Sequence, residues 1–377
     1  MLRLPLTLLI TASFLALAWF VSLRQSLLLL IGIGMGGILA GARFGFTTGW
    51  RRLIEQRDTS GVMAQIVLLA VAAVISIPLL AYFPNDLMAA LGPPSVSLLV
   101  GAFVFGIAMQ VADGCGSGTL YKAGLGIPLN MAILPMFALG SFLGSAHLSH
   151  WLSLGAIQPV SMVGSLGALP AVLLTFAGLA IAGLLAYGWS KRKTPDAAAA
   201  APSPQARKNA AAPRWFDRRL AIAGIGLALL AVLNLVVAGQ PWGVVYGFGL
   251  WGAKLATAAG LFDPTTNAFW SQPGNLHALE QTVFLDVTTI TNIGIMAGAL
   301  WIAARKAPGA SRMTGQQWLI GIIAGFLLGY SSRLAFGCNV GAMVSGISTG
   351  SLHGWIWVVM AFAGSLIGVR LRRRYGF

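Results

Sequence analysis

The chain has 377 residues, 57% of them hydrophobic and only 9% charged, and its formal net charge is +15. Soluble domains carry roughly 25% charged residues, so this composition excludes a soluble protein and predicts an all-α integral membrane protein. The positive charge does not predict nucleic-acid binding, because the Lys and Arg residues gather in short segments beside apolar runs.

Nine apolar runs are long enough to cross a bilayer as helices, since a crossing needs about 20 residues. In chain order they lie at 6–22, 62–82, 95–113, 127–147, 164–189, 219–238, 282–304, 316–336 and 353–371. The first run has no clear small-residue cleavage site, so we interpret it as a retained span rather than a signal peptide. Two glycine-rich segments, 27–50 and 239–260, are expected to be re-entrant or broken half-helices.

The basic segments predict the topology of the chain. Under the positive-inside rule they face the cytoplasm of a bacterial inner (plasma) membrane. They lie at 51–57, 191–196, 214–219, 304–312 and 370–377. The C-terminus and the central linker are therefore expected in the cytoplasm.

The organisation predicted from composition is two halves joined by a linker. The segment 191–218 is basic at its ends and rich in Ala and Pro inside, which is typical of a flexible linker. It separates an N-terminal half, 1–190, from a C-terminal half, 219–377. The predicted linker belongs to the cytoplasmic side.

The two halves contain a repeated motif. Shifting "FVFGIAMQVADGCGSG" by 223 positions onto "FLLGYSSRLAFGCNVG" pairs Cys115 with Cys338, the only two cysteines in the chain, and Gly114 with Gly337. The loop charges direct the helix before Cys115 inward and the helix before Cys338 outward. The halves are therefore predicted to be inverted repeats, an arrangement that also puts the N-terminus on the periplasmic face.

The glycines around each cysteine predict a helix break. A break exposes unpaired N–H groups at the positive end of a helix dipole, and these attract anions. A neutral, buried thiol adds a soft, polarizable S–H donor, which suits a large sulfur-bearing anion. The alternative is that each cysteine is a small packing residue, since free cysteine is among the most buried residue types.

Three stretches resemble the YeeE/YedE family of sulfur-compound transporters: "FGIAMQVADGCGSGTLYKAG", "LAFGCNVGAMVSGISTGSLHGW" and "GQPWGVVYGFGLWGAK". The resemblance implies thiosulfate uptake through an hourglass-shaped protein, in which Cys115 and Cys338 pass the anion inward by transient S–H to sulfur contacts. Members of this kind often carry a further cysteine at the substrate entrance, near the first re-entrant element. Here "ARFGFTTG" has no cysteine, and Phe46 lies close to that position.

Polar residues near the breaks complete the candidate site. Lys122, Arg333 and Lys254 are expected either to supply positive potential to the anion path or to extend to the membrane interface. Asp113 would repel an anion and is expected to cap a helix or to pair with a cation. The candidate substrate-binding residues are Cys115, Cys338, Gly114, Gly116, Gly337, Asn339, Lys122, Arg333 and Lys254. Asn339 is expected to donate an amide N–H to an oxyanion or to cap a helix, and Glu280 and Asp286 are expected to be structural.

No metal or cofactor is predicted. His147 and His150 have a spacing that suits a metal, but no cysteine or carboxylate lies near them, so an interfacial pair is favoured. His353, beside Trp355 and Trp357, resembles an interfacial aromatic belt. No phosphate-binding G-x-x-x-x-G-K-[ST] loop occurs.

The function predicted is a permease and not an enzyme. Its substrate is expected to be thiosulfate or a related inorganic sulfur anion, and the alternatives within the same fold are sulfide, polysulfide or a selenium compound. A membrane thiol oxidoreductase with Cys115 and Cys338 as its redox pair is disfavoured, because there is no Cys-x-x-Cys pair. A structural membrane subunit is a third alternative. The expected partners are the lipid bilayer and a cytosolic sulfur-carrier protein, without nucleic acid.

Overall fold

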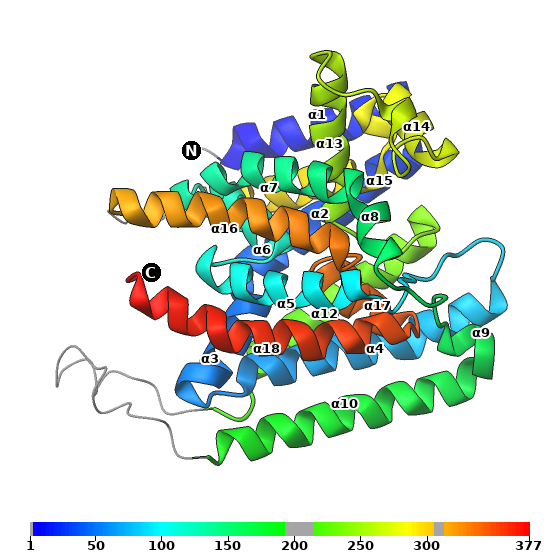
Figure 1. Ribbon diagram of the computed structural model, residues 1–377. Coiled ribbons are helices and arrows are strands. Elements are labelled where there is room, and N and C mark those ends of the chain that lie inside the picture. Colours follow the sequence, from blue (N-terminus) through cyan, green and yellow to red (C-terminus); the bar gives the residue numbers. More distant parts are fainter. Residues whose placement is uncertain (1–2, 193–213, 305–312) are drawn as a thin grey trace.

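The computed structural model describes residues 3–192, 214–304 and 313–377, and Figure 1 shows a bundle built of helices. Within those ranges no β-strand forms, and two isolated bridges are the extent of β pairing. The predicted all-α class is confirmed. Most of the predicted linker, residues 193–213, lies outside the described residues.

The N-terminal half contains ten of the described helices. They are α1 (Arg3–Phe20), α2 (Leu23–Ala42), α3 (Phe46–Gln56), α4 (Ser60–Tyr82), α5 (Val96–Val111), α6 (Gly116–Gly124), α7 (Pro128–Ala146), α8 (Leu148–Ser153), α9 (Met162–Leu166) and α10 (Ala168–Ser190).

The C-terminal half adds seven α-helices, two 3₁₀ turns and one π-helical segment. They are α12 (Arg218–Ala238), α13 (Val245–Ala258), η1 (Pro264–Thr266), α14 (Pro273–Glu280), η2 (Val283–Leu285), α15 (Val287–Ala303), α16 (Gly315–Leu334), the π-helical η3 (Asn339–Ser345), α17 (Gly346–Ser348) and α18 (Leu352–Arg374).

In the described part of the chain nine helical stretches are long and apolar enough to span a bilayer, which equals the predicted number, but the two sets differ. The stretch 23–56 is among the nine although no crossing was predicted there, and the predicted run 282–304 is not, because α15 has only 17 residues. In Figure 1 the long axes of α4, α5, α10, α16 and α18 run roughly parallel, as membrane-spanning helices do.

The first of the two segments expected to be re-entrant contains a full-length helix. Ser22 caps α2 through Gln25, and α2 then runs for 20 residues until Arg43 takes up the left-handed conformation. Near its start Gln25 donates to the carbonyl of Leu285, and near its end the carbonyl of Gly41 accepts from Arg219. Helix α2 therefore crosses the bundle, and the break follows at residues 43–45.

This extra crossing places both chain termini at one end of the bundle (Figure 1). The Arg3 guanidinium lies 4.0 Å from the ring centroid of Trp301, close to the end of α15. The C-terminus lies beside the start of α16, where Gln317 donates to the carbonyl of Gly376. The expectation of an N-terminus on the opposite face counted no crossing between residues 27 and 50, and the membrane face on which each terminus lies stays a prediction.

The second glycine-rich segment has the expected form of a half-helix. Residues 239–244 are not helical, and α13 that follows has only 14 residues. Trp242, in the non-helical part, is almost fully buried. Irregular backbone of this kind is tolerated at membrane depth where protein covers it or where it lines a cavity.

Three pairs of helices pack closely, and each pair joins one half of the chain to the other. Helix α2 packs against α15, α5 against α18 and α7 against α16. Glycines make the contact possible: a Cβ built on Gly36 would lie 2.0 Å from the carbonyl oxygen of Ile295, and one built on Gly106 would lie 2.0 Å from that of Ala361. Small residues let membrane helices approach in this way. This interlocking brings the breaks after α5 and α16 together.

Candidate functional site

The two cysteines occupy equivalent places in two loops of the same backbone shape. After α5, Asp113 has φ 55°, and after α16, Phe336 has φ 57°. Two residues later Cys115 (φ −84°, ψ −168°) is the N-cap residue of α6 and Cys338 (φ −95°, ψ −166°) is that of η3. The repeated motif therefore has a repeated local conformation, whereas the inverted relation of the whole halves stays a prediction.

Equivalent hydrogen bonds close both loops. The glycine before each cysteine donates to a carbonyl of the preceding helix, and each cysteine carbonyl accepts from the residue four positions later. The pairs are Gly114 to Met109 (3.1 Å), Gly337 to Ser332 (2.8 Å), Thr119 to Cys115 (2.8 Å) and Ala342 to Cys338 (2.8 Å). The cysteines are thus held on short, well-defined turns.

The structure brings Cys115, Gly116 and Cys338 together. Both thiols are free and buried, with 1% and 0% of each residue exposed. The Cys115 sulfur lies 3.4 Å from the hydroxyl of Ser117. A Cβ built on Gly116 would lie 3.1 Å from the Cys338 sulfur, so the sulfur of one loop packs over the glycine of the other. Two soft S–H groups therefore share one buried centre.

Asn339 adds an amide beside this centre. Its side chain is fully buried, and neither its Nδ2 nor its Oδ1 has a hydrogen-bond partner among the described residues. A buried polar group without a partner is costly unless something else satisfies it. Asn339 is therefore available to a ligand that reaches Cys338.

A large cavity approaches the second loop from the end of the bundle opposite the chain termini. Its volume is about 590 Å³, and it reaches Phe336, Gly341 and Ser345. The rest of its lining comes from the start of α2, the loop at 88–90, the segment 240–243, the start of α13, α14, the connection at 281–286 and the start of α15. The predicted broken element thus forms part of a cavity wall.

Two charged residues, Arg24 and Asp286, lie in this cavity wall. Arg24 donates to the carbonyls of Val237 and Ala238. Asp286 caps α15 by accepting from the N–H of Thr289 (2.6 Å), as a structural residue is expected to do.

A second, much smaller cavity approaches the first loop from the other side. It is lined by Cys115, Lys122 and the segment 44–48, and its volume is about 10 Å³, room for one water at most. Phe46 lies here, beside Cys115 and at the end of the bundle that holds the termini, and not in the large cavity. The chain is therefore hollow on the Cys338 side and closed on the Cys115 side.

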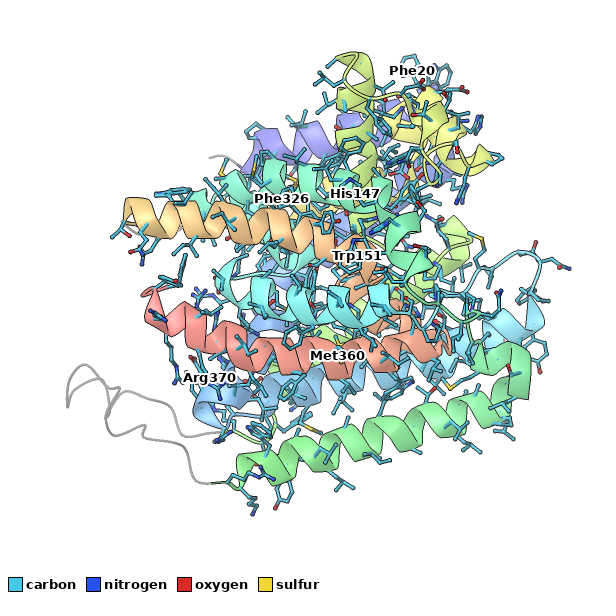
Figure 2. All side chains as sticks on the ribbon, in the orientation of Figure 1. Phe20, His147, Trp151, Phe326, Met360 and Arg370 are labelled. Carbon is cyan, nitrogen blue, oxygen red and sulfur yellow. The ribbon has the colours of Figure 1, made fainter. Side chains whose placement is uncertain are left out.

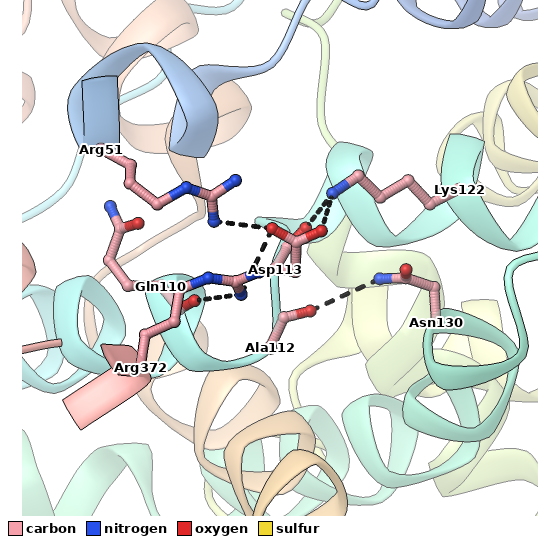
Figure 3. Close-up of polar contacts among 7 residues, drawn as sticks. All are labelled: Arg51, Gln110, Ala112, Asp113, Lys122, Asn130 and Arg372. Carbon is pink, nitrogen blue, oxygen red and sulfur yellow. Dashed lines mark hydrogen bonds and ion pairs between the residues drawn. The ribbon is translucent and has the colours of Figure 1, made fainter. Parts of the chain in front are cut away.

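Asp113, beside the small cavity, forms ion pairs with three cations (Figure 3). Its carboxylate lies 2.7 Å from Arg51 of α3, 2.5 Å from Lys122 of α6 and 3.4 Å from Arg372 of α18. The expected pairing of Asp113 with a cation is correct, with Lys122 as one partner. Arg51 and Arg372 were missed, because both lie in basic segments that the sequence presents as topology signals.

Arg333 and Lys254 are not brought to the cysteines. The Arg333 guanidinium donates to the hydroxyl of Ser145 (2.7 Å) and lies over the ring of Phe269, 5.1 Å from its centroid. Lys254 donates to the carbonyls of Leu279 and Gln281. Neither residue lines the two cavities described above. Their contacts fix the position of the α13–α14 region.

The histidines serve packing and hydrogen bonding. The ring of His147 and the indole N–H of Trp151, two residues labelled in Figure 2, both bond to the hydroxyl of Tyr330. In the described part of the chain no cluster of His, Cys, Asp and Glu could hold a metal. His353 is buried and bonds to Ser351 (2.6 Å), so its expected place in an interfacial belt is wrong. The reason is that this face of α18 packs against Gly346 of α17.

Long apolar helices, two interlocked halves and a cavity leading to buried polar groups define a multi-pass membrane transporter. Comparison with known proteins gives the family. The chain belongs to the sulphur transport family, whose shared pattern matches residues 41–367. The resemblance to YeeE/YedE proteins is thereby confirmed.

Three relatives show how far the similarity extends. The thiosulfate transporter TsuA of Spirochaeta thermophila is 26% identical over 346 residues, which cover 89% of this chain and 96% of that protein. The thiosulfate transporter TsuA of Escherichia coli is 24% identical over 355 residues, covering 89% and 91%. The probable transporter YedE of Escherichia coli is 29% identical over 152 residues, covering 39% and 36%.

Proposed function

We propose that the protein imports thiosulfate, or a related inorganic sulfur anion, across the plasma membrane by way of Cys338 and then Cys115. One observation carries the proposal: two free, buried thiols lie in two loops of the same conformation, one reached by a large cavity and the other beside a small one. The substrate class is supported by two relatives that are thiosulfate transporters by name and that match along most of their length.

The order of contacts follows from the cavities. An anion enters the large cavity and passes Phe336 and Gly341 to the thiol of Cys338, where the unpartnered amide of Asn339 donates to an oxyanion oxygen. It then moves to Cys115 and leaves through the small cavity, which must widen. Passage needs sites that bind well enough to admit an ion and weakly enough to release it. Neutral S–H groups, as weak donors, meet that requirement.

The proposal predicts that neither cysteine can be replaced. In the variants Cys115→Ala and Cys338→Ala, uptake of labelled thiosulfate by protein reconstituted in liposomes should fall to background, as should thiosulfate-dependent growth. Thr175→Ala is the matched control, because it removes a buried side-chain group from α10. It should transport at the wild-type rate.

Abundance in the membrane separates loss of function from loss of folding. All three variants should be present at wild-type levels. Wild-type uptake by both cysteine variants would exclude the relay. A separate measurement on the wild-type protein, comparing uptake of thiosulfate, sulfate, sulfide and selenium analogues, would identify the substrate.

A further inference from the structure

We propose that Arg51, Lys122 and Arg372 form a second anion site at the closed end of the pathway, and that the carboxylate of Asp113 occupies it until a sulfur dianion displaces it. This inference rests on the proposed function for the identity of the ion. Figure 3 shows the three cationic side chains converging on Asp113 from α3, α6 and α18.

The charges at this place do not balance. Three cations surround one carboxylate, and the exposed fractions of the four side chains are only 12–28%. The cluster therefore carries two positive charges in excess, at a depth where they are screened less than on an open surface. Because the displaced carboxylate is tethered and stays beside the cations, a dianion has the charge that neutralises this excess.

The location of the cluster fits the path of a transported ion. Asp113 and Lys122 line the same small cavity as Cys115. An anion that leaves the Cys115 thiol toward the basic end of the bundle therefore meets these cations next. The amide of Gln110, one turn before Asp113 on α5, is buried and has no hydrogen-bond partner among the described residues.

The equivalent loop after α16 shows that the backbone conformation at position 113 does not require an aspartate. Phe336 takes the place of Asp113 in the second loop and has almost the same φ, 57° against 55°. An aspartate at 113 is therefore explained by its charge. As a tethered anion, the Asp113 carboxylate holds the three cations together. It also competes with the transported anion for them, so that the anion is released quickly.

The test measures anion binding separately from the cysteine relay. In the full-length protein carrying Cys115→Ala and Cys338→Ala, the thiosulfate Kd is measured by calorimetry with and without Asp113→Asn. Asn is chosen because it tolerates the left-handed conformation. Removal of the competing charge should lower the Kd about tenfold, and Arg51→Gln added to Asp113→Asn should reverse this gain.

The effect on turnover is measured in the protein that keeps both cysteines. There Asp113→Asn should slow thiosulfate uptake at saturating substrate, because release becomes slower. The matched control is Arg370→Gln, which removes one charge from the exposed surface of α18 (Figure 2). It should change neither Kd nor uptake.

The result that overturns the site is a Kd for Asp113→Asn equal to that of its parent. If Asp113→Asn does not fold, the thiosulfate Kd of Arg372→Gln tests the site instead. This variant should fold, because Asp113 keeps its other two cationic partners, Arg51 and Lys122. A Kd in Arg372→Gln unchanged from Arg370→Gln would then also exclude the site. Failure of the cysteine relay alone leaves these measurements intact, since they are made without the cysteines.

Discussion

At the scale of single residues, glycine sets the conformation of the loop before Cys338. Gly337 has φ 148°, a region that side chains rarely adopt, and a Cβ there would lie 2.5 Å from the backbone nitrogen of Ala342. Gly114, the equivalent residue of the first loop, is less restricted, with its nearest neighbour at 3.0 Å. The two loops therefore differ in how strictly they require glycine.

Gly337→Ala should destabilise the protein by roughly 1–3 kcal/mol, the usual cost of a disfavoured backbone conformation. The control is Gly315→Ala at the start of α16, where a Cβ would meet nothing within 4 Å. Thermal unfolding in detergent should show a lower midpoint for Gly337→Ala than for Gly315→Ala. Equal midpoints would contradict the strain at Gly337.

The candidate site was predictable from the sequence only where residue type and repetition agreed. Cys115 and Cys338 stood out because the only two cysteines fell on one repeat position. Arg51 and Arg372 could not be found in the same way, because a basic residue near the end of a span satisfies the positive-inside rule whatever else it contacts. Only the fold brings them to Asp113.

At the scale of elements, the same glycines that made α2 look broken hold it against α15. This glycine-rich run was interpreted as re-entrant because a full crossing would upset the topology predicted from the loop charges. In a membrane the absence of a side chain serves helix contact instead. A Cβ on Gly36 would lie 2.0 Å from the carbonyl oxygen of Ile295, and one on Gly298 would lie 2.1 Å from that of Ile33.

Two adjacent glycines of α2 provide a matched pair of variants. Gly36→Ala should separate α2 from α15 and lower the midpoint of thermal unfolding. Gly37→Ala places the same methyl group where nothing lies within 4 Å, so the higher helix propensity of alanine should leave stability equal or raised. If both variants unfold at the same temperature, close glycine contact is not what holds this helix pair.

At the scale of the whole molecule, the fold class and about nine crossings followed from composition and the lengths of apolar runs, because lipid permits few other solutions. The position of the N-terminus did not follow, because it depends on whether one segment crosses. With α2 counted as a crossing, the N-terminal helix begins at the same end of the bundle as the C-terminus. The positive-inside rule predicts that this end faces the cytoplasm.

Labelling of introduced cysteines tests this topology. Both native cysteines are buried, so a membrane-impermeant maleimide should give little background. A cysteine added at either terminus should be labelled only after the cells are permeabilised. Asn85→Cys, in the exposed loop after α4, should be labelled in intact cells. Labelling of the N-terminal cysteine in intact cells would mean that α1 or α2 does not cross, and would restore the opposite-face arrangement that inversion of the halves alone predicts.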